Sequence, residues 1–177
     1  YTKQEDHIVL MSPVYHPFFE VVRDHQRPME IVSLQDRDGR FYFDWEDFEE
    51  KLSRSKMFLL CNPHNPGGRV WTKEELTKLG EICLKHKVII LSDEIHRDLV
   101  YKNYVYTPIA SISEEILMNS ITCTAPSKTF NIAGLKVSNI IIANEELRKK
   151  VNRSLNINEV IEPNIFGIEA LIAAYSE

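Results

Sequence analysis

Short runs of isoleucine, valine and leucine alternate with amphipathic segments along almost the whole chain. This alternation is typical of an α/β domain, in which helices cover a sheet. Strands that are covered on both faces are apolar throughout, rather than at every second position. We expect strands at Ile8–Met11, Glu30–Leu34, Met57–Cys61, Val88–Leu91, Ser120–Thr124 and Val137–Ala143.

Helices are expected between most of these strands. The clearest, Lys73–His86, begins with a capping box formed by Thr72 and Glu75, which satisfies two free backbone donors. Asp44 is placed to cap a second helix at Trp45–Ser53. The remaining expected helices are Phe18–His25, Glu145–Leu155 and Asn164–Tyr175.

Two features predict how neighbouring strands pair. Asp38 and Gly39 form a turn signal, which predicts a hairpin between Glu30–Leu34 and Phe41–Phe43. Twelve residues separate the last two expected strands, and they include a proline, a glycine and many polar groups. A parallel crossover usually needs a helix over a dozen or more residues. We therefore expect the last strand to run antiparallel and the sheet to be mixed.

Composition limits the class of protein. The 177 residues are 44% hydrophobic and 27% charged, which is typical of one soluble globular domain. A net charge of -5 does not favour a nucleic-acid partner, and no apolar run is long enough to span a membrane. The polar start, Tyr1–His7, lacks the features of a signal peptide. Because the chain opens without methionine and stops inside a helical pattern, we expect a longer natural protein.

The three cysteines, Cys61, Cys83 and Cys123, lie in apolar segments at wide and unequal spacing. This spacing matches no metal-ligand pattern, so no metal site is predicted. Small core residues in a reducing cytosol are the simplest interpretation. We accordingly expect a cytoplasmic protein.

Four expected strands end in a burst of polar or conformationally special residues. These bursts are Ser12–Tyr15, Asn62–Gly68, Ser92–His96 and Ala125–Thr129. In open α/β sheets, ligands bind beyond the carboxyl ends of the strands. If the four strands are parallel neighbours, their ends form one site that holds an amine, a carboxylate, an amide and an aromatic ring.

Three of these motifs, in order and spacing, carry a resemblance to a known family. Asn62–Arg69, Ser92–His96 and Ser127–Gly134 resemble the class I/II aminotransferases, which use pyridoxal 5'-phosphate (PLP). The particular residues in these motifs are similar to those of the cystathionine β-lyase, or cysteine-S-conjugate β-lyase, branch of the family. The resemblance implies a three-layer α/β/α fold with a mostly parallel mixed sheet, of which residues 1–177 form the central part of the PLP-binding large domain.

The resemblance also implies what this stretch of sequence lacks. Family chains are about twice as long, so a phosphate-binding loop is expected upstream of Tyr1 and a C-terminal small domain beyond Glu177. The isolated segment is therefore predicted to be inactive or nearly so. Family members further imply a homodimer with the site near the subunit interface.

Three residues match the family's central cofactor contacts. Lys128 matches the Schiff-base lysine, whose amine must be neutral part of the time to attack an aldehyde. Asp93 matches the carboxylate that pairs with the pyridine nitrogen and keeps it protonated. Asn65 matches the amide that hydrogen-bonds the phenolic oxygen, and the resemblance implies a cis peptide before the next residue, Pro66.

Four further residues complete the candidate set. Tyr15 matches the aromatic side chain that stacks on the cofactor ring. Ser127 matches a phosphate-binding hydroxyl, while Lys136 stands where the family often has arginine and Ala125 where it often has a hydroxyl. Lysine keeps the positive charge but lacks the bidentate fork. His96 stands where many aminotransferases have tyrosine, and the β-lyase-like branch has histidine there.

Each of these residues also has a plainer interpretation. An isolated lysine such as Lys128 is usually a surface residue. Asp93 alone would be a helix cap or part of a surface ion pair, Asn65 a turn residue, Tyr15 a half-buried tyrosine at a strand end, and His96 a structural histidine. The three motifs in sequence favour the cofactor site over these alternatives.

The leading functional hypothesis is a C–S β-lyase that splits cystathionine or related cysteine S-conjugates into a thiol, pyruvate and ammonia. An aminotransferase, which exchanges an amino group between an amino acid and a keto acid, is the alternative; His96 and Lys136 favour the lyase. A non-catalytic regulatory protein on the same scaffold is a third reading. A nucleotide-binding domain is disfavoured because no glycine-rich phosphate fingerprint is present.

Overall fold

Six strands form the central sheet of the computed structural model, which describes residues 1–160 and 162–176. The strand order is β2-β1-β5-β6-β7-β8. Their bounds are β1 His7–Ser12, β2 Met29–Ser33, β5 Ser55–Cys61, β6 Ile89–Asp93, β7 Ser120–Thr124 and β8 Asn139–Ile141. The first five are parallel, and β8 runs antiparallel to β7. The mostly parallel mixed sheet and its antiparallel last strand confirm the prediction.

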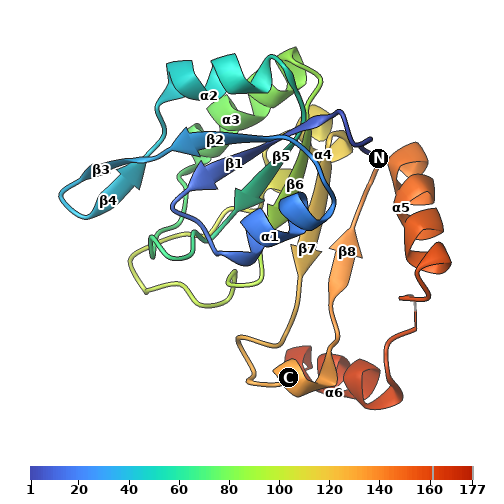
Figure 1. Ribbon diagram of the computed structural model, residues 1–177. Helices are drawn as coiled ribbons and strands as arrows, with labels where there is room; N and C mark the ends of the chain where they lie inside the picture. The colour runs from blue at the N-terminus through green and yellow to red at the C-terminus, as the bar shows by residue number, and fades with distance from the viewer. Residues whose placement is uncertain (161, 177) are drawn as a thin grey trace.

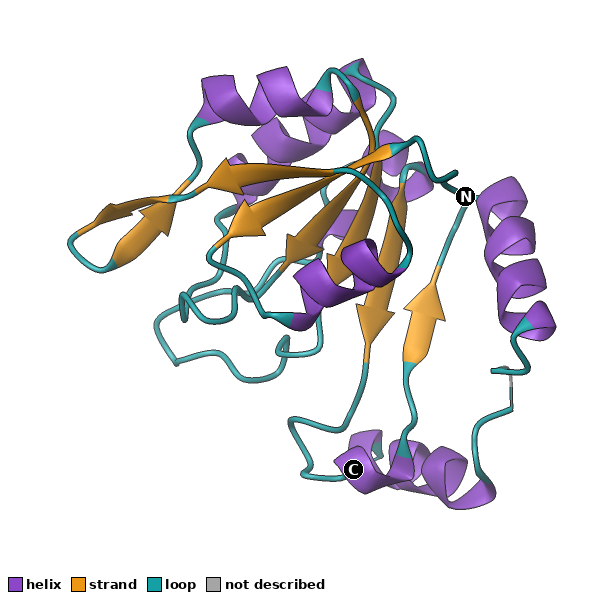
Figure 2. Ribbon diagram, viewed as in Figure 1, coloured by secondary structure: helices purple, strands orange, loops and turns teal. Residues whose placement is uncertain are grey.

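Helices lie on both faces of this sheet, so the layers are those of an α/β/α domain (Figures 1 and 2). Figure 1 shows α2 and α3 over one face and α1 over the other, with α5 beyond the β8 edge and α6 across the end of the β7–β8 pair. The bounds are α1 Pro17–Asp24, α2 Trp45–Leu52, α3 Lys73–Lys85, α4 Glu114–Met118, α5 Glu145–Ile157 and α6 Ile165–Tyr175. None of the described helices is both long and apolar enough to cross a bilayer.

The expected caps are present at two helix starts. The Thr72 hydroxyl accepts the backbone N–H of Glu75 at 3.2 Å, and the Glu75 carboxylate accepts the N–H of Thr72 at 2.8 Å. Asp44 accepts the N–H of Asp47 at the start of α2. These side chains satisfy backbone donors that the first helical turn leaves free. Local sequence therefore sets where both helices begin.

The main core lies between the α2–α3 layer and the sheet. It contains closely packed aromatic rings, with Phe43 5.1 Å from Phe48 and 4.7 Å from Trp71 between centroids. Phe48 and Trp71 are fully buried, and the apolar residues of β1 and, in β5, Phe58–Cys61 are buried as well. Cys61 and Cys83 are buried in this layer, as expected from their apolar surroundings. This packing makes β1, β5 and β6 a rigid platform whose carboxyl ends carry the polar motifs.

The hairpin prediction is partly wrong. Its turn is at Asp38 and Gly39, both with positive φ, but the paired strands are β3 Gln35–Arg37 and β4 Arg40–Tyr42. The expected partner, Glu30–Leu34, instead pairs as β2 with β1 in parallel. A short turn joins only the residues directly beside it, whereas β2 buries Val32 by joining the large sheet.

Candidate functional site

The carboxyl ends of β1, β5, β6 and β7 meet at one edge of the sheet, as predicted from the four polar bursts. Cys61 on β5 is in register with Asp93 on β6, and Asp93 is in register with Cys123 on β7. The loops that follow are tied to this row by backbone hydrogen bonds from Asn62 N–H to Asp93 O and from Glu94 N–H to Cys123 O. The sheet therefore holds Asp93 in a fixed place between two apolar thiols.

Asp93 is a largely buried carboxylate. Its Oδ1 accepts a hydrogen bond from the backbone N–H of Ile95 at 3.1 Å. Burial raises the pKa of Asp93, and the backbone donor, the charge that His96 carries when it is protonated and the charge of Lys128 oppose that rise. Desolvation dominates because a charge loses more by leaving water than one neutral donor returns. Asp93 is thus a site where an additional cation would be favourable.

Lys128 lies in the turn that follows β7, and its side chain is exposed. The positive charge of Lys128 lowers the pKa of both Asp93 and His96, so the three groups lie close enough to interact electrostatically. Burial is the main reason that the pKa of His96 is lowered. The amine and the carboxylate predicted to form the centre of the site are therefore found at the same edge.

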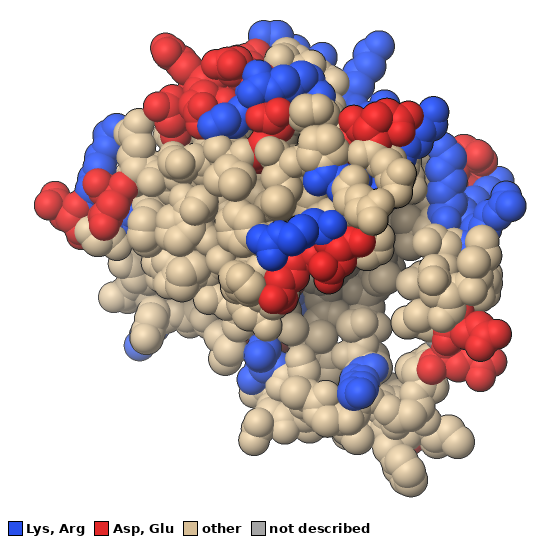
Figure 3. Space-filling view, in the orientation of Figure 1, with Lys and Arg blue, Asp and Glu red and all other residues tan. Residues whose placement is uncertain are grey.

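The space beside α1 forms the first of two hollows, with a volume of about 680 Å³. This α1 hollow is lined by Tyr15, Asp93, Thr124 and Ala125, together with apolar residues of α1 and of the strands. Figure 3 shows the molecular surface recessed between α1 and the end of the molecule that contains α5 and α6. The α1 hollow thus places an aromatic ring and a buried carboxylate on one cavity wall.

The second hollow has a volume of about 530 Å³ and lies among the loops that follow β5 and β6. This loop hollow is lined by Asn65 and His96 from the predicted site, and by Arg40, Tyr101 and Tyr104 among others. The predicted residues therefore border two adjacent hollows rather than one. The Asp-Glu-Ile-His segment contributes to both hollows, since Asp93 lines one and His96 the other.

The predicted phosphate residues lie further along the chain. Ser127 is half-buried beside Lys128, whereas Lys136 is exposed and follows the short 3₁₀ helix Ala133–Leu135. The described residues that line the two hollows do not include Ser127, Lys128 or Lys136. Ala125, by contrast, lines the α1 hollow. The structure therefore brings Tyr15, Asp93 and Lys128 to one edge but leaves Lys136 at its periphery.

The loop that carries Asn65 is held by a buried histidine. His64 Nε2 lies 2.8 Å from the carbonyl oxygen of Pro13, and because a carbonyl only accepts, Nε2 carries the proton. His64 Nδ1 is buried and has no hydrogen-bond partner among the described residues, and burial lowers the pKa of His64. The Asn65-Pro66 peptide is cis, as the resemblance implied. His64 thus joins the Asn65 loop to the segment that carries Tyr15.

Glu94 is a buried carboxylate that sequence reasoning missed. It accepts hydrogen bonds from the Ser92 hydroxyl at 2.8 Å, from the Tyr106 hydroxyl and from the Ile109 backbone N–H at 3.2 Å. Successive strand residues point to opposite faces, so Glu94 and Ser92 face the side away from Asp93. This alternation of side-chain directions was a sequence signal from which the buried Glu94 could have been predicted. Glu94 anchors the segment from Ile95 to Pro108, which contains His96.

The chain was compared with known proteins, and it matches one family over nearly its whole length. The family described as aminotransferase class I and II matches residues 1–175. Cystathionine beta-lyase PatB of Bacillus subtilis (strain 168) is 46% identical over 179 residues, which cover 100% of this chain and 46% of that protein. The chain therefore spans less than half the length of this relative.

Two solved structures share the fold. Cystalysin from Treponema denticola, which contains a pyridoxal 5'-phosphate cofactor, has a TM-score of 0.93 and 40% identity over 96% of this chain and 44% of its own. The PLP-bound C-S lyase from Staphylococcus hominis has a TM-score of 0.81 and 34% identity over 87% of this chain and 40% of its own. The motifs, the sheet and these similarities agree, and the chain belongs to the class I and II aminotransferase family.

Proposed function

We propose that the complete protein is a PLP-dependent C–S β-lyase, which cleaves cystathionine or related cysteine S-conjugates into a thiol, pyruvate and ammonia. One observation carries the proposal: Asp93 ends β6 in register with Cys123 of the neighbouring strand β7, and Lys128 lies in the turn that follows β7, so the carboxylate and the amine belong to the same carboxyl edge of the sheet. The similarity to a cystathionine beta-lyase and to C-S lyase structures supports this reaction over others of the family.

The donor groups at this edge fit PLP. When bound, the cofactor supplies an electron sink for the charge that develops at the substrate α-carbon. Asp93 is suited to a protonated ring nitrogen because a buried carboxylate gains most from a cation beside it. Tyr15, 48% exposed on the wall of the α1 hollow, offers a free aromatic face. Asn65 and His96 are proposed partners of the phenolic oxygen, from the loop hollow.

The phosphate is proposed to be bound by Ser127 and Lys136. Both belong to the loop that also carries Lys128, so one loop would supply the covalent and the ionic anchors. Lys136 attracts the phosphate as a point charge, without the two parallel hydrogen bonds that arginine offers. A phosphate loop outside residues 1–177 would supply further donors.

The proton transfers are assigned to Lys128. In the proposed reaction its neutral amine takes the proton from the substrate α-carbon, and the resulting ammonium returns a proton to the departing sulfur. Asp93 would hold its negative charge beside the ring nitrogen of the bound cofactor. His96, with its lowered pKa, is neutral at pH 7 and contributes a hydrogen bond rather than a charge.

The relatives' length supports a domain assignment. We propose that residues 1–177 form the central part of the PLP-binding large domain, and that the small domain and the upstream phosphate loop complete the active site. A homodimer in the cytoplasm, acting on a small amino-acid substrate, is part of the same proposal. Size-exclusion chromatography with light scattering on the complete protein tests the dimer.

An aminotransferase is the alternative, because the family includes that activity and the same residues serve both reactions. The two differ in whether the substrate β-carbon bears a leaving group. The discriminating experiment supplies the complete protein with PLP and cystathionine, with and without a keto acid. Pyruvate and homocysteine without a keto acid support the lyase, whereas a new amino acid that appears only with the keto acid supports the aminotransferase.

Two variants link the result to the site. Lys128→Ala is expected to lose both turnover and the violet absorbance band of the lysine-bound cofactor. Glu81→Ala, at an exposed position on α3, is the matched control and should keep both. A protein that shows neither reaction and no violet band would favour the regulatory alternative and contradict the proposal.

A further inference from the structure

Asp98, two residues beyond His96, joins segments that are far apart in the sequence. Its Oδ2 accepts a hydrogen bond from the hydroxyl of Thr129 at 3.1 Å and from the hydroxyl of Tyr175 at 2.7 Å. Its Oδ1 lies 3.5 Å from Nε of Arg97. One carboxylate therefore connects the loop after β6, the turn after β7 and the end of α6.

Thr129 is the residue next to Lys128, so the bond from Asp98 acts directly on the lysine's own turn. That turn is closed by backbone hydrogen bonds from Phe130 N–H to Pro126 O and from Ile132 N–H to Ser127 O. Lys128 itself is exposed. A lysine side chain has several rotatable bonds and adopts many conformations. The position of the Lys128 backbone therefore determines in what fraction of these conformations the amine lies at the proposed cofactor site.

Tyr175 is held firmly enough to act as the second donor. Its ring meets Phe130 edge-on at 5.1 Å, and the Arg97 guanidinium lies 5.4 Å from its centroid. Burial, and then its hydrogen bond to Asp98, raises the pKa of Tyr175. The phenol consequently stays protonated at neutral pH and continues to donate.

The other end of α6 contacts the same loop. The Asn164 side chain, which caps α6, donates to the carbonyl oxygen of Leu135. Gly167 packs so closely that an added Cβ would lie 3.2 Å from both that oxygen and the side chain of Val137. Figure 1 shows α6 lying across the end of the β7–β8 pair. The helix thus supports the Lys128 loop at two places.

We propose that Asp98 is a positioning residue for Lys128: it fixes the lysine's turn to the loop that carries His96, and Tyr175 of α6 completes the clamp. The inference rests on the proposed function, since the position of Lys128 matters for chemistry only if that lysine carries the cofactor.

The test measures how fast the lysine captures PLP in the complete protein. Cofactor is removed, PLP is added back, and the appearance of the violet band is followed, with the pH midpoint of the band and the melting temperature as further readouts. Asp98→Ala should slow capture about tenfold or more, because a displacement of about 1 Å can have a large effect on reactivity. Asp98→Asn should restore most of the rate, since an amide oxygen still accepts both hydroxyls.

Two more variants separate positioning from folding. Tyr175→Phe keeps the ring contacts with Phe130 and Arg97 but removes the hydroxyl, so it should slow capture at an unchanged melting temperature. Glu81→Ala on α3 should match the wild type. Capture within about twofold of wild type in both Asp98→Ala and Tyr175→Phe would overturn the inference; if Asp98→Ala does not fold, Tyr175→Phe alone decides. A wild-type protein without a violet band would instead overturn the proposed function.

Discussion

Asp93 has opposite effects on stability and on function. Its carboxylate lies at the end of a strand whose neighbours contribute apolar thiols, and burial raises its pKa. In the cofactor-free protein the folded state therefore binds a proton at Asp93 more readily than the unfolded state does. By linkage, stability falls as the pH rises from the ordinary value of 3.8 through the raised pKa, so the ionised Asp93 is destabilising at neutral pH.

The Asp93→Asn variant tests this conflict. At pH 7 the cofactor-free variant should melt above the wild type, at about 2–4 °C for each kcal/mol recovered, because a neutral amide replaces a desolvated charge. The difference should vanish below pH 3.8, where the wild-type carboxyl is protonated in both states. PLP turnover should fall about 10²–10³-fold, the usual effect of losing one fixed electrostatic partner.

A matched control is available at the exposed hairpin tip. Asp38→Asn changes the same charge without desolvation, and should leave both the melting temperature and turnover near wild type. A cofactor-free Asp93→Asn protein that melts below the wild type at pH 7 would show that Asp93 is stabilised by its surroundings, contrary to this account.

Individual site residues were predictable from the sequence where a local pattern marks them. Asp93 follows a continuous apolar strand, and Lys128 stands in a recognisable motif. Asp98 was missed because its role depends on partners that only the fold brings near: Tyr175 is 77 residues away, and no local pattern encodes such a pair. Glu94 was missed although the strand alternation offered a local signal, and only its bond to Tyr106, 12 residues away, depends on the fold.

Among the elements, the loop after β5 depends on a close contact between a glycine and a histidine. A Cβ built on Gly67 would lie 2.3 Å from Nδ1 of His64 and 2.8 Å from the ring of Phe41. Since His64 is buried and held by Pro13, it has little freedom to move away. The Asn65 loop is therefore held both by the packing of Gly67 against His64 and Phe41 and by the hydrogen bond from His64 to Pro13.

Gly67→Ala should consequently displace the loop and lower the free energy of unfolding by about 1–3 kcal/mol, the usual cost of overpacking. Chemical denaturation measures the loss, and PLP affinity should weaken with it because Asn65 moves. Gly134→Ala is the control, since a Cβ there meets open space. Equal stability of the two variants would contradict the packing described for this loop.

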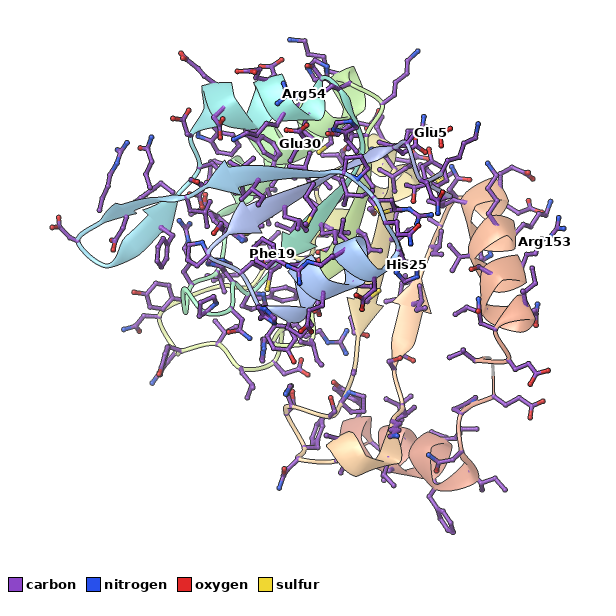
Figure 4. The ribbon with its side chains drawn as sticks, viewed as in Figure 1. Glu5, Phe19, His25, Glu30, Arg54 and Arg153 are labelled. Carbon is purple, nitrogen blue, oxygen red and sulfur yellow. The ribbon has the colours of Figure 1, made fainter. Side chains whose placement is uncertain are left out.

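A second element-scale prediction concerns β2 and the segment that follows α2. Arg54 donates to both oxygens of Glu30, at 2.9 and 2.8 Å, and Figure 4 shows the two residues on these neighbouring elements. The Arg54 hydrogen bond is the main reason that the pKa of Glu30 is lowered to about 2. A lowered folded pKa stabilises the protein above the ordinary value of 4.5, and this contribution is lost as the pH falls towards 2.

Glu30→Gln should therefore melt below the wild type at pH 7, and the two melting temperatures should converge as the pH is lowered from 4.5 towards 2. Glu50→Gln is a suitable control because its carboxylate, 73% exposed, pairs with the same arginine from a wetter position. A difference between Glu30→Gln and wild type that stays constant with pH would contradict the ion-pair account.

Most elements were predictable because their signals are local. Apolar runs located the strands of the large sheet to within about two residues at each end, including the last, which spans Asn139–Ile141 where Val137–Ala143 was expected. Capping residues located the starts of α2 and α3. The hairpin partner was wrong because strand pairing depends on which surface is buried elsewhere in the fold, and periodicity alone does not carry that information.

At the scale of the whole molecule, the described residues hold the centre of a site whose other parts are proposed to lie outside them. Large apolar side chains are exposed on α6 and on β8, including Ile165 at 77% and Ile141 at 49%. The chain also spans less than half of the relatives that it matches. The fold class was nevertheless predictable, because the apolar strands and the amphipathic helices that alternate with them are visible in these 177 residues.

A polypeptide of residues 1–177 alone should accordingly give no measurable pyruvate from cystathionine and PLP. Its carboxyl edge contains Lys128 and Asp93, but under the proposal the substrate and phosphate contacts come from elsewhere in the complete protein. Coupled detection of pyruvate, with the complete protein as the positive control, measures this. Full turnover by the isolated polypeptide would mean that the described residues form a whole active site.

The central claim is that Lys128 holds the cofactor opposite Asp93. Borohydride reduction of the complete protein with bound PLP, followed by proteolysis and mass spectrometry, identifies the labelled lysine directly. The account predicts a single phosphopyridoxyl group on Lys128. A label on Lys136 or another lysine, or no label on a protein that binds PLP tightly, would contradict it.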